Sequence, residues 1–303
     1  MQKIFAAIDV GTNSTRLLVA QLMENGQLLP LCTDLAVTRI GEQMHKALLM
    51  PWAMERTLSA IEKFARCAHD YAPQNIVIAA TSAVRSAANS AEFACMVQES
   101  LGIELNILSG SQEAYLSYLG VKSVFGDIAD SLVIDIGGGS TEFIWTENGE
   151  QRFLSTNAGA VRLMEKRLAN KSSTDVTLNW QEEWLGDALR LVLAECPKEI
   201  IGVGGTVTTL AAMAQQIAVY DGYKTHGYRL TTAQVNELAC TLHRLTLEER
   251  IKLPGLEPKR ADIIPAGADI LRTILGTLDK DSLLVCEADI LFGLILNFTH
   301  NTA

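Results

Sequence analysis

Two short runs of the sequence combine an aspartate, a glycine turn and hydroxyl side chains. They read Asp9-Val-Gly-Thr-Asn-Ser-Thr15 and Asp135-Ile-Gly-Gly-Gly-Ser-Thr-Glu142, and their shared residues recur at one spacing of 126 residues. Glycines permit a tight turn whose backbone N–H groups can face phosphate oxygens. One such turn alone is more often a plain hairpin, but the repetition favours phosphate binding. The predicted phosphate-binding residues are Gly11, Thr12, Asn13 and Ser14 in the first turn, and Gly137, Gly138, Gly139, Ser140 and Thr141 in the second.

Two carboxylates flank the second turn. Asp135 ends one predicted strand and Glu142 begins the next, so both could approach one hydrated Mg²⁺. Mg²⁺ is usually held by one or two carboxylates together with substrate phosphates and water. We therefore predict a magnesium site at this pair, while an ordinary solvated strand position stays open for Glu142.

A second set of charged residues follows two predicted parallel strands. Arg85 comes after strand 75–80, where ligands of α/β sheets commonly lie, and a guanidinium matches the geometry of a phosphate. Glu113 opens a helix after strand 104–108, so it lies beside Arg85 if the two strands are neighbours. A carboxylate there could take a proton from an attacking water. From position alone, stabilisation of the helix dipole is the simpler interpretation of Glu113.

A third glycine junction occurs at Gly204-Gly205-Thr206, between a predicted strand and a predicted helix. Backbone N–H groups at a helix N-terminus favour anions, so this junction is a candidate contact for a nucleotide or another phosphate. Tight packing between the strand and the helix is the alternative.

The elements that must position these residues alternate between strands and helices. In the first part the pattern predicts strands at 3–10, 15–23, 27–38, 75–80 and 104–108, and helices at 51–71, 88–101 and 112–124. After Gly126 it predicts strands at 131–135, 141–146, 151–157, 200–203 and 283–286, and helices at 177–196, 206–219, 232–245 and 260–278. The alternation indicates the α/β class, with a duplicated opening and a boundary near Gly126.

The composition argues against several classes of binding partner. The formal net charge of −10 opposes capture of nucleic acid or an anionic membrane by a broad surface field. No apolar run reaches the roughly 18 residues of a membrane span, and the opening is too short for a signal sequence, so we expect a cytoplasmic protein. The six cysteines contain no C-x-x-C pair, so we expect reduced, mostly buried thiols.

Together these segments resemble the exopolyphosphatase and guanosine pentaphosphate phosphatase family, Ppx/GppA, in its short two-domain form. The resemblance runs through the two glycine turns and through Thr38-Arg-Ile-Gly41, Ala80-Thr-Ser-Ala-Val-Arg85, Ser109-Gly-Ser-Gln-Glu-Ala114, Gly159-Ala-Val-Arg-Leu163, Val203-Gly-Gly-Thr206 and Arg260-Ala-Asp-Ile-Ile264. It implies two actin-like, ribonuclease H-like lobes with a cleft between them, at 1–125 and 126–303. The second lobe would be rich in helices, and the last helix would pack back on the first.

The resemblance also implies roles for the candidate residues. Glu113 takes the position of the catalytic base, Asp135 and Glu142 those of the magnesium-associated carboxylates, and Arg85 and both turns those of phosphate contacts. One segment departs from the family, which often reads V-S-x-x-G-L-R-E-G, whereas Val285-Cys-Glu-Ala-Asp-Ile-Leu-Phe-Gly293 lacks the arginine and the glutamate.

The activity that we predict is hydrolysis of a phosphoanhydride, with release of terminal orthophosphate from inorganic polyphosphate. Removal of the 5′-phosphate of guanosine pentaphosphate is the alternative, and the guanosine tetraphosphate counts among the candidate ligands. Two other classes stay open: a non-catalytic sensor of these anions, and an ATP-dependent kinase or chaperone-like ATPase of the same superfold. The quaternary state is also open, a homodimer included.

Overall fold

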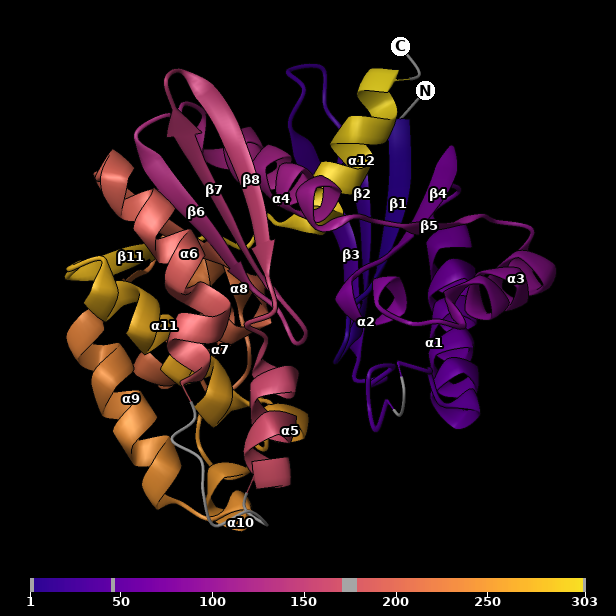
Figure 1. The fold of residues 1–303 in the computed structure, drawn as a ribbon. Coiled ribbons are helices and arrows are strands. Elements are labelled where there is room, and N and C mark those ends of the chain that lie inside the picture. The colour runs from indigo at the N-terminus through magenta and orange to yellow at the C-terminus, as the bar shows by residue number, and fades with distance from the viewer. Residues whose placement is uncertain (1–2, 45–46, 171–178, 302–303) are drawn as a thin grey trace. The chain divides into compact units, whose positions relative to one another are not determined.

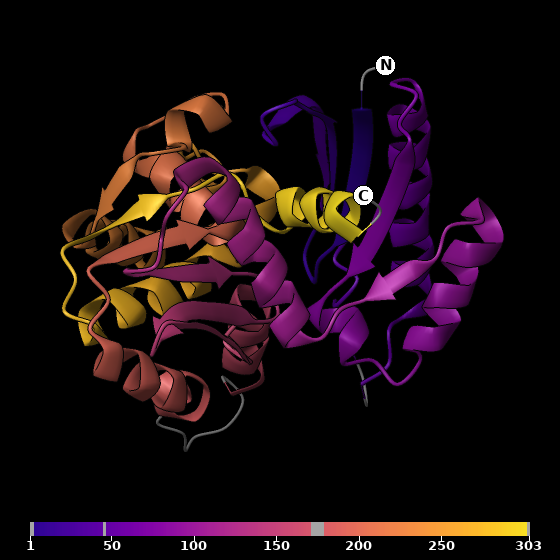
Figure 2. The same cartoon turned by 90° about the horizontal axis from the view of Figure 1, so that it is seen from above.

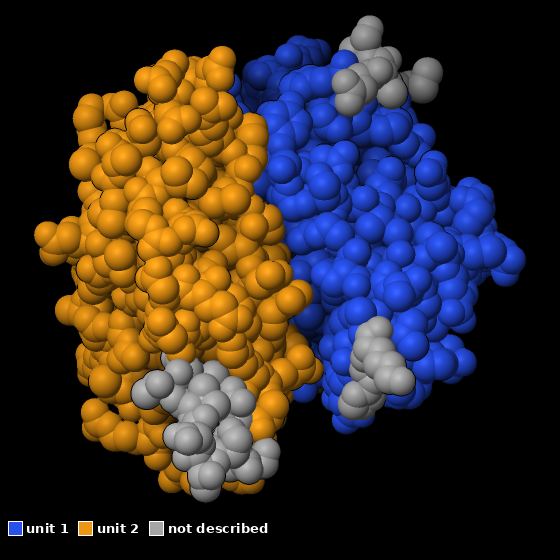
Figure 3. All heavy atoms as spheres, viewed as in Figure 1, with its two compact units in different colours: residues 1–126, 288–303 blue, residues 127–287 orange. Residues whose placement is uncertain are grey.

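The computed structural model describes residues 3–44, 47–170 and 179–301. The chain forms two compact units, coloured separately in Figure 3. Unit 1 consists of residues 1–126 and 288–303, and unit 2 of residues 127–287. Each unit contains one mixed sheet covered by helices, and more of the described helices belong to unit 2. The predicted α/β class is therefore confirmed.

Unit 1 has a five-stranded sheet in the order β3-β2-β1-β4-β5. The strands are β1 (Lys3–Val10), β2 (Thr15–Leu22), β3 (Leu28–Ala36), β4 (Asn75–Ala80) and β5 (Leu105–Ile107). The helices are α1 (Pro51–His69), α2 (Ser82–Arg85), α3 (Ser90–Leu101), α4 (Gly110–Phe125) and α12 (Ile290–Asn301). β1, β2 and β3 form the predicted antiparallel meander, whereas β4 and β5 run parallel to β1.

Strand β1 is buried on both faces because helices cover both sides of the sheet. Its residues Ala6 and Ile8 belong to the apolar cluster that includes Phe64 of α1. Phe5, on the opposite face, belongs to a cluster with Leu294 of α12. Figure 1 and Figure 2 show α12, in yellow, running alongside β1 and α4. The last helix of the chain therefore completes the core of unit 1.

Two glycines allow α12 and α4 to approach each other closely. A Cβ atom on Gly120 of α4 would overlap the backbone of Asp289, and one on Gly293 of α12 would overlap the backbone of Leu116. Neighbouring Leu291 is buried and Phe292 is partly buried in the same apolar cluster. The apolar residues that replace the family's arginine and glutamate thus pack in the core.

Unit 2 has a six-stranded sheet in the order β10-β11-β9-β6-β7-β8. The strands are β6 (Ser131–Ile136), β7 (Thr141–Glu147), β8 (Glu150–Thr156), β9 (Glu199–Val203), β10 (Arg229–Thr231) and β11 (Ser282–Val285). The helices are α5 (Ala160–Asn170), α6 (Trp180–Glu195), α7 (Gly204–Ala214), α8 (Gly222–Thr225), α9 (Thr232–Arg244), α10 (Leu247–Arg250) and α11 (Ile264–Thr277), with a 3₁₀ turn at Pro258–Arg260. β6, β7 and β8 repeat the antiparallel meander of unit 1, and β9 runs parallel to β6.

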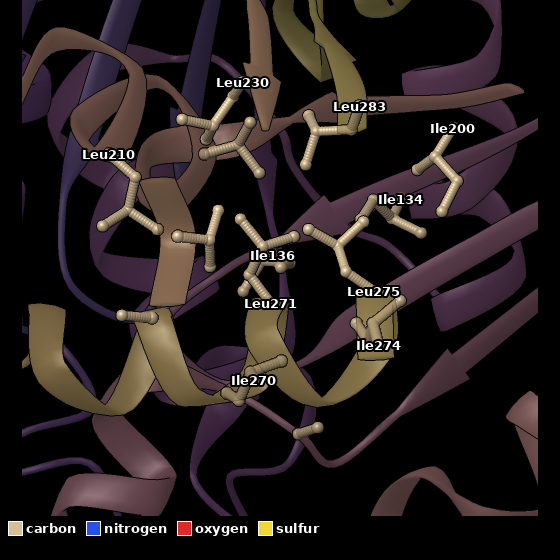
Figure 4. Packing of buried hydrophobic residues seen from close by; sticks show 14 of the residues in the cluster. Ile134, Ile136, Ile200, Leu210, Leu230, Ile270, Leu271, Ile274, Leu275 and Leu283 are labelled. Carbon is tan, nitrogen blue, oxygen red and sulfur yellow. The ribbon is translucent and has the colours of Figure 1, made fainter. Parts of the chain in front are cut away.

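The core of unit 2 lies between this sheet and α11. Figure 4 shows Ile134 and Ile136 of β6 beside Leu271 and Leu275 of α11, and all four side chains are fully buried. Burial of such side chains is the main stabilising contribution to a unit of this size. It fixes β6, and therefore the turn that follows β6.

Several sequence predictions need correction at their ends. The helix predicted at 260–278 begins at Ile264, because residues 258–260 form a separate 3₁₀ turn. The helix predicted at 206–219 begins at Gly204 and already ends at Ala214. The start of the helix predicted at 177–196 lies outside the described residues, and α6 begins at Trp180.

Two expectations drawn from composition concern the burial of the thiols and the presence of membrane-spanning helices. Of the six cysteine thiols only that of Cys286 is buried, so the prediction of mostly buried thiols is wrong. In the described part of the chain, no helix combines the length and the apolar character needed to cross a membrane.

Candidate functional site

The two glycine turns have the same backbone geometry in their separate units. In unit 1 the Gly11 N–H donates to the Ser14 carbonyl over 3.0 Å, and in unit 2 the Gly137 N–H donates to the Ser140 carbonyl over 3.0 Å. Each turn joins the first two strands of its meander. The duplication seen in the sequence therefore extends to the hydrogen bonds that close each turn.

The first turn carries buried polar atoms without protein partners. Thr12 and Asn13 are 8% and 5% exposed. Among the described residues, nothing hydrogen-bonds to the Thr12 Oγ1, the Asn13 Nδ2 and Oδ1, or the Asp9 Oδ1. Buried polar atoms are nearly always paired, so a cluster of such atoms on one turn indicates a place for water or a polar ligand. This observation supports the predicted binding role of residues 11–14.

An arginine neutralises the aspartate at the base of this turn. Asp9 and Arg16 are directly opposite each other on β1 and β2, and the Arg16 Nη2 lies 2.7 Å from the Asp9 Oδ2. Arg16 also forms an ion pair with Asp289, which precedes α12. Burial raises the pKa of the Asp9 carboxyl, although the Arg16 guanidinium acts in the opposite direction. Asp289 therefore ties the start of α12 to the strand that leaves the turn.

The structure brings Arg85 and Glu113 together, as the neighbouring strands predict. β4 and β5 are parallel neighbours, and α2 and α4 begin after them. The Arg85 Nη1 donates to the Glu113 Oε2 over 2.6 Å and to the Leu108 carbonyl over 2.9 Å. Both side chains are largely buried, at 24% and 11% exposed. A charge-assisted bond of this kind fixes the orientation of the carboxylate.

Helix α4 begins where it does because of its cap. The Ser109 hydroxyl accepts from the Gln112 N–H, and the Gln112 side chain accepts from the Ser109 N–H. This capping box satisfies two N–H groups of the first turn. Glu113 follows Gln112 in the same first turn, so the cap fixes the position from which its carboxylate projects.

In unit 2 the corresponding strand pair carries two carboxylates. Asp135 of β6 and Glu142 of β7 are directly opposite each other, so their side chains share one face of the sheet. Asp135 is 9% exposed and Glu142 is 1% exposed. The Ser155 hydroxyl on β8 donates to the Glu142 Oε1 over 2.6 Å. Two buried carboxylates on one face favour a nearby cation.

The N-terminus of α5 supports the second turn from behind. The Ala160 N–H donates to the Gly137 carbonyl over 3.0 Å, and the Val161 N–H donates to the Gly138 carbonyl over 2.8 Å. A Cβ atom on Gly159 would overlap the backbone of the turn at Gly138 and Gly139. The helix therefore holds the turn through backbone contacts that only a glycine at 159 permits.

The third glycine junction lies against Asp135. Gly204 begins α7 with a φ of +84°, and a Cβ atom there would overlap the Asp135 carboxylate. The positive end of the α7 dipole is therefore close to a carboxylate. A Cβ atom on Gly205 would in turn overlap the Arg260 guanidinium. Thr206 packs against Gly267 of α11.

No role for Arg260 was predicted from the sequence, although its guanidinium lies in this region. Arg260 is part of the segment 260–264 that resembles the family, but it lies 55 residues beyond Gly205 and no local pattern connects the two. The contact places a guanidinium at the start of α7, where an anion would be favoured.

Asp135 and Glu142 supply two carboxylates, which is the number and kind of side chain that usually binds Mg²⁺ in proteins. Among the residues that the structure describes, no three His, Cys, Asp or Glu side chains gather into a metal-binding group. Mg²⁺ does not need such a group, because it keeps several waters and shares substrate phosphate oxygens. The pair is therefore a suitable partial shell for Mg²⁺.

The structure groups the predicted site residues within each unit. Unit 1 holds the turn 11–14 and the Arg85–Glu113 pair, and unit 2 holds the turn 137–141, the Asp135–Glu142 pair and the junction 204–206. Their catalytic and binding roles stay predictions.

Comparisons with known proteins cover nearly the whole chain. A family model described as the Ppx/GppA phosphatase family matches residues 18–301. The Exopolyphosphatase 2 of Mycobacterium tuberculosis is 33% identical, over 96% of this chain and 97% of that protein. A bifunctional 3-dehydroquinate synthase/phosphatase of Fusobacterium nucleatum is 36% identical over 98% of this chain, which spans only 46% of the relative's length. The crystal structure of the Aquifex aeolicus member of the Ppx/GppA family superposes with a TM-score of 0.77 at 27% identity, covering 100% of this chain and 99% of that one.

Proposed function

The chain belongs to the Ppx/GppA phosphatase family, and we propose that it hydrolyses the terminal phosphoanhydride of inorganic polyphosphate. The family match and the full-length similarity to a protein named as an exopolyphosphatase support this substrate. The observation that carries the proposal is the Arg85–Glu113 pair at the ends of β4 and β5.

In the proposed reaction, Glu113 accepts a proton from a water molecule whose oxygen attacks the terminal phosphorus. The bond between that phosphorus and the bridging oxygen breaks, so the products are orthophosphate and a chain shorter by one phosphate. Arg85 holds the Glu113 carboxylate through the 2.6 Å bond to its Oε2, which restricts how the base can be oriented. A fixed base is effective because proton transfer needs correct geometry first.

The negative charge on the transferred phosphoryl group is stabilised mainly by hydrogen-bond donors, and the protein forms no covalent bond to the group. Phosphoryl transfer has a loose transition state, in which positioning and electrostatic stabilisation supply most of the catalysis. In the proposal the turns 11–14 and 137–141 supply backbone N–H groups, and the hydroxyl of Thr12 and the amide of Asn13 bind phosphate oxygens. Within the described part of the chain, the Thr12 Oγ1 and the Asn13 Nδ2 have no hydrogen-bond partner, which supports this assignment.

Asp135 and Glu142 would hold Mg²⁺ in the active protein. The ion supplies neutralising charge to phosphate oxygens. The two carboxylates lie opposite each other on β6 and β7, and Ser155 orients the Glu142 side chain.

Guanosine pentaphosphate is a second candidate substrate because of one observation in unit 2. The junction 204–206 places two glycines and the Arg260 guanidinium at the N-terminus of α7. A surface of this kind suits a nucleotide phosphate or its neighbouring sugar. Polyphosphate would have no nucleoside to place there.

The two substrates are separated by parallel assays of phosphate release with Mg²⁺. We expect kcat/KM to be higher for long-chain polyphosphate than for guanosine pentaphosphate, and Gly205→Ala to affect the nucleotide more strongly. A higher kcat/KM for guanosine pentaphosphate would identify that nucleotide as the preferred substrate. If both anions bound and neither released phosphate, the hydrolase proposal would fail and a sensor role would replace it.

A further inference from the structure

Two cysteine side chains touch each other in unit 1, away from the residues of the proposed reaction. Cys32 lies on β3 and Cys67 on α1, and their sulfur atoms are 3.8 Å apart. Both thiols are free and only partly buried, so a small oxidant can reach them. Both also pack at the margin of the apolar cluster between α1 and the sheet.

From this contact we propose that Cys32 and Cys67 form a reversible disulfide when the protein meets a peroxide or a low-molecular-weight disulfide. A disulfide has an S–S distance of about 2.05 Å, so the sulfurs need to approach by under 2 Å. Side-chain torsions can supply a shift of that size. The inference does not depend on the proposed phosphatase activity.

With hydrogen peroxide the chemistry balances in two steps. The Cys32 thiolate attacks one peroxide oxygen, which gives a sulfenic acid and hydroxide. The Cys67 sulfur then attacks the sulfenic sulfur, an S–S bond forms, and water leaves. The two thiols lose two electrons in total, and the peroxide is reduced to two waters once the released protons are counted. A dithiol reductant reverses the change by thiol–disulfide exchange.

The residues around the two thiols influence the rate of oxidation through the pKa of Cys67. Partial burial raises the pKa of the Cys67 thiol, and its contact with Cys32 and the nearby carboxylates of Asp70 and Asp34 add to this effect. The thiolate is the reactive form, so oxidation should become faster as the pH rises. The pH dependence of the oxidation rate is therefore a further property to measure.

The disulfide would restrain a segment that touches the first glycine turn. Residues 37–50 connect β3 to α1, and the Arg39 N–H donates to the Asn13 carbonyl over 2.8 Å. The Gly41 N–H donates to the Thr12 carbonyl over 3.2 Å. A bond between Cys32 and Cys67 closes a loop around this segment, which lowers the freedom of the unfolded chain.

Peptide mapping of the intact protein after peroxide treatment tests the proposal. We expect a digest analysed without reducing agent to contain a peptide linking Cys32 to Cys67. We also expect a monomer mass lower by two hydrogens, and full reversal of both changes by dithiothreitol. Cys32→Ser and Cys67→Ser should each abolish the linked peptide, whereas Cys240→Ser, at an exposed thiol of unit 2, should retain it.

Two further measurements keep the test decisive if a variant folds poorly. Compared with the reduced protein, the oxidised wild-type protein should exchange the backbone amide hydrogens of residues 37–44 and 47–50 more slowly. The thermal midpoint of unit 1 should rise by several degrees. Alkylation of both Cys32 and Cys67 after peroxide treatment, while other thiols cross-link, would overturn the proposal.

Discussion

One of the differences between the two copies of the glycine turn reverses a charge. Arg16 stands opposite Asp9 in unit 1, and at the equivalent position of unit 2 Glu142 stands opposite Asp135. The first aspartate therefore has a cation supplied by the chain, through the ion pair with Arg16. The second shares its face of the sheet with another carboxylate. The duplicated motif has thus diverged into one turn paired with an arginine and one turn flanked by two carboxylates.

Replacing Glu142 should weaken the response to magnesium. We expect Glu142→Gln to raise the Mg²⁺ concentration needed for half-maximal phosphate release by about tenfold or more, because one charged ligand is lost. The change keeps the size of the side chain. The matched control is Glu150→Gln, at an exposed position of the same hairpin, which should leave the magnesium dependence unaltered. Equal magnesium curves for wild type and Glu142→Gln would remove Glu142 from the proposed site.

Replacing Arg85 should reduce the catalytic rate without unfolding the protein. Lysine keeps the charge but loses the planar guanidinium, whose Nη1 donates to both Glu113 and the Leu108 carbonyl, so we expect Arg85→Lys to lower kcat by about tenfold and Arg85→Gln by about 10²-fold. Circular dichroism would check the fold. A kcat for Arg85→Lys equal to that of wild type would show that the guanidinium group is not needed.

Two ion pairs of unit 1 differ in how far they could be predicted from the sequence. The Arg85–Glu113 contact follows from two parallel strands that end at one edge, a local pattern that the alternation of elements reveals. The Arg16–Asp289 ion pair joins residues 273 positions apart. No periodicity or motif spans such a separation, and only the return of α12 to the first sheet brings the two together.

At the scale of elements, backbone contacts at glycines position the turns. Gly159 lets α5 meet the second turn, Gly204 lets α7 meet Asp135, and Gly293 lets α12 meet α4. Each contact places a helix against a backbone or a carboxylate at a distance that a Cβ atom would forbid. These glycines therefore act through close approach, and only Gly204 also needs a positive φ.

A methyl group at position 159 should disturb the second turn. We expect Gly159→Ala to destabilise unit 2 by about 1–3 kcal/mol, as overpacking does, and to lower phosphate release in the fraction that folds. Gly276→Ala is the control, since a Cβ atom there would meet none of the described residues within 4 Å and the φ of Gly276 is not positive. In a helix this control should raise stability by about 0.5–1 kcal/mol. Denaturant melts of both variants would measure the difference, and equal stabilities would contradict the close contact.

Sequence patterns predicted most of the long elements, but no range was predicted for the helices α5 and α12 or for several short elements. The meander strands β1 and β2 match the predicted positions within one residue, because alternating and continuous apolar runs mark them clearly. Strand β10 was not predicted, because its three residues are too few to show a period and it lies at the edge of the sheet, beside β11. The four-residue helix α2 was missed for the same reason.

At the scale of the whole molecule, the chain leaves unit 1 and later returns to it. Residues 288–303 belong to unit 1, although they follow the whole of unit 2. Asp289 and α12 make this return through the ion pair with Arg16 and the apolar contacts with Phe5 and Leu116. The core of unit 1 is therefore incomplete until the last part of the chain has folded.

Acid should destabilise unit 2 through His226. Burial lowers the pKa of His226 below the ordinary value of 6.5, and its Nδ1 accepts the Glu287 N–H over 3.3 Å, which requires the neutral ring. The unfolded chain therefore binds the proton more readily, so stability is present above about pH 6.5 and falls as the pH drops below it. We expect His226→Gln to flatten this slope.

Tryptophan fluorescence suits this measurement, because Trp145, Trp180 and Trp184 lie in unit 2 and only Trp52 lies in unit 1. The control is His69→Gln, at an exposed histidine of α1, which should retain the wild-type slope. An unchanged slope in His226→Gln would assign the acid sensitivity to other groups.

The most direct test of the central claim compares Glu113→Gln with Glu92→Gln in phosphate release from long-chain polyphosphate at saturating Mg²⁺. Both glutamates lie in the first turn of a helix of unit 1, but Glu92 is exposed. We predict that Glu113→Gln lowers kcat by about 10²-fold or more with polyphosphate binding retained, and that Glu92→Gln leaves kcat unchanged. Equal kcat values for Glu113→Gln and wild type would contradict the assignment of Glu113 as the base.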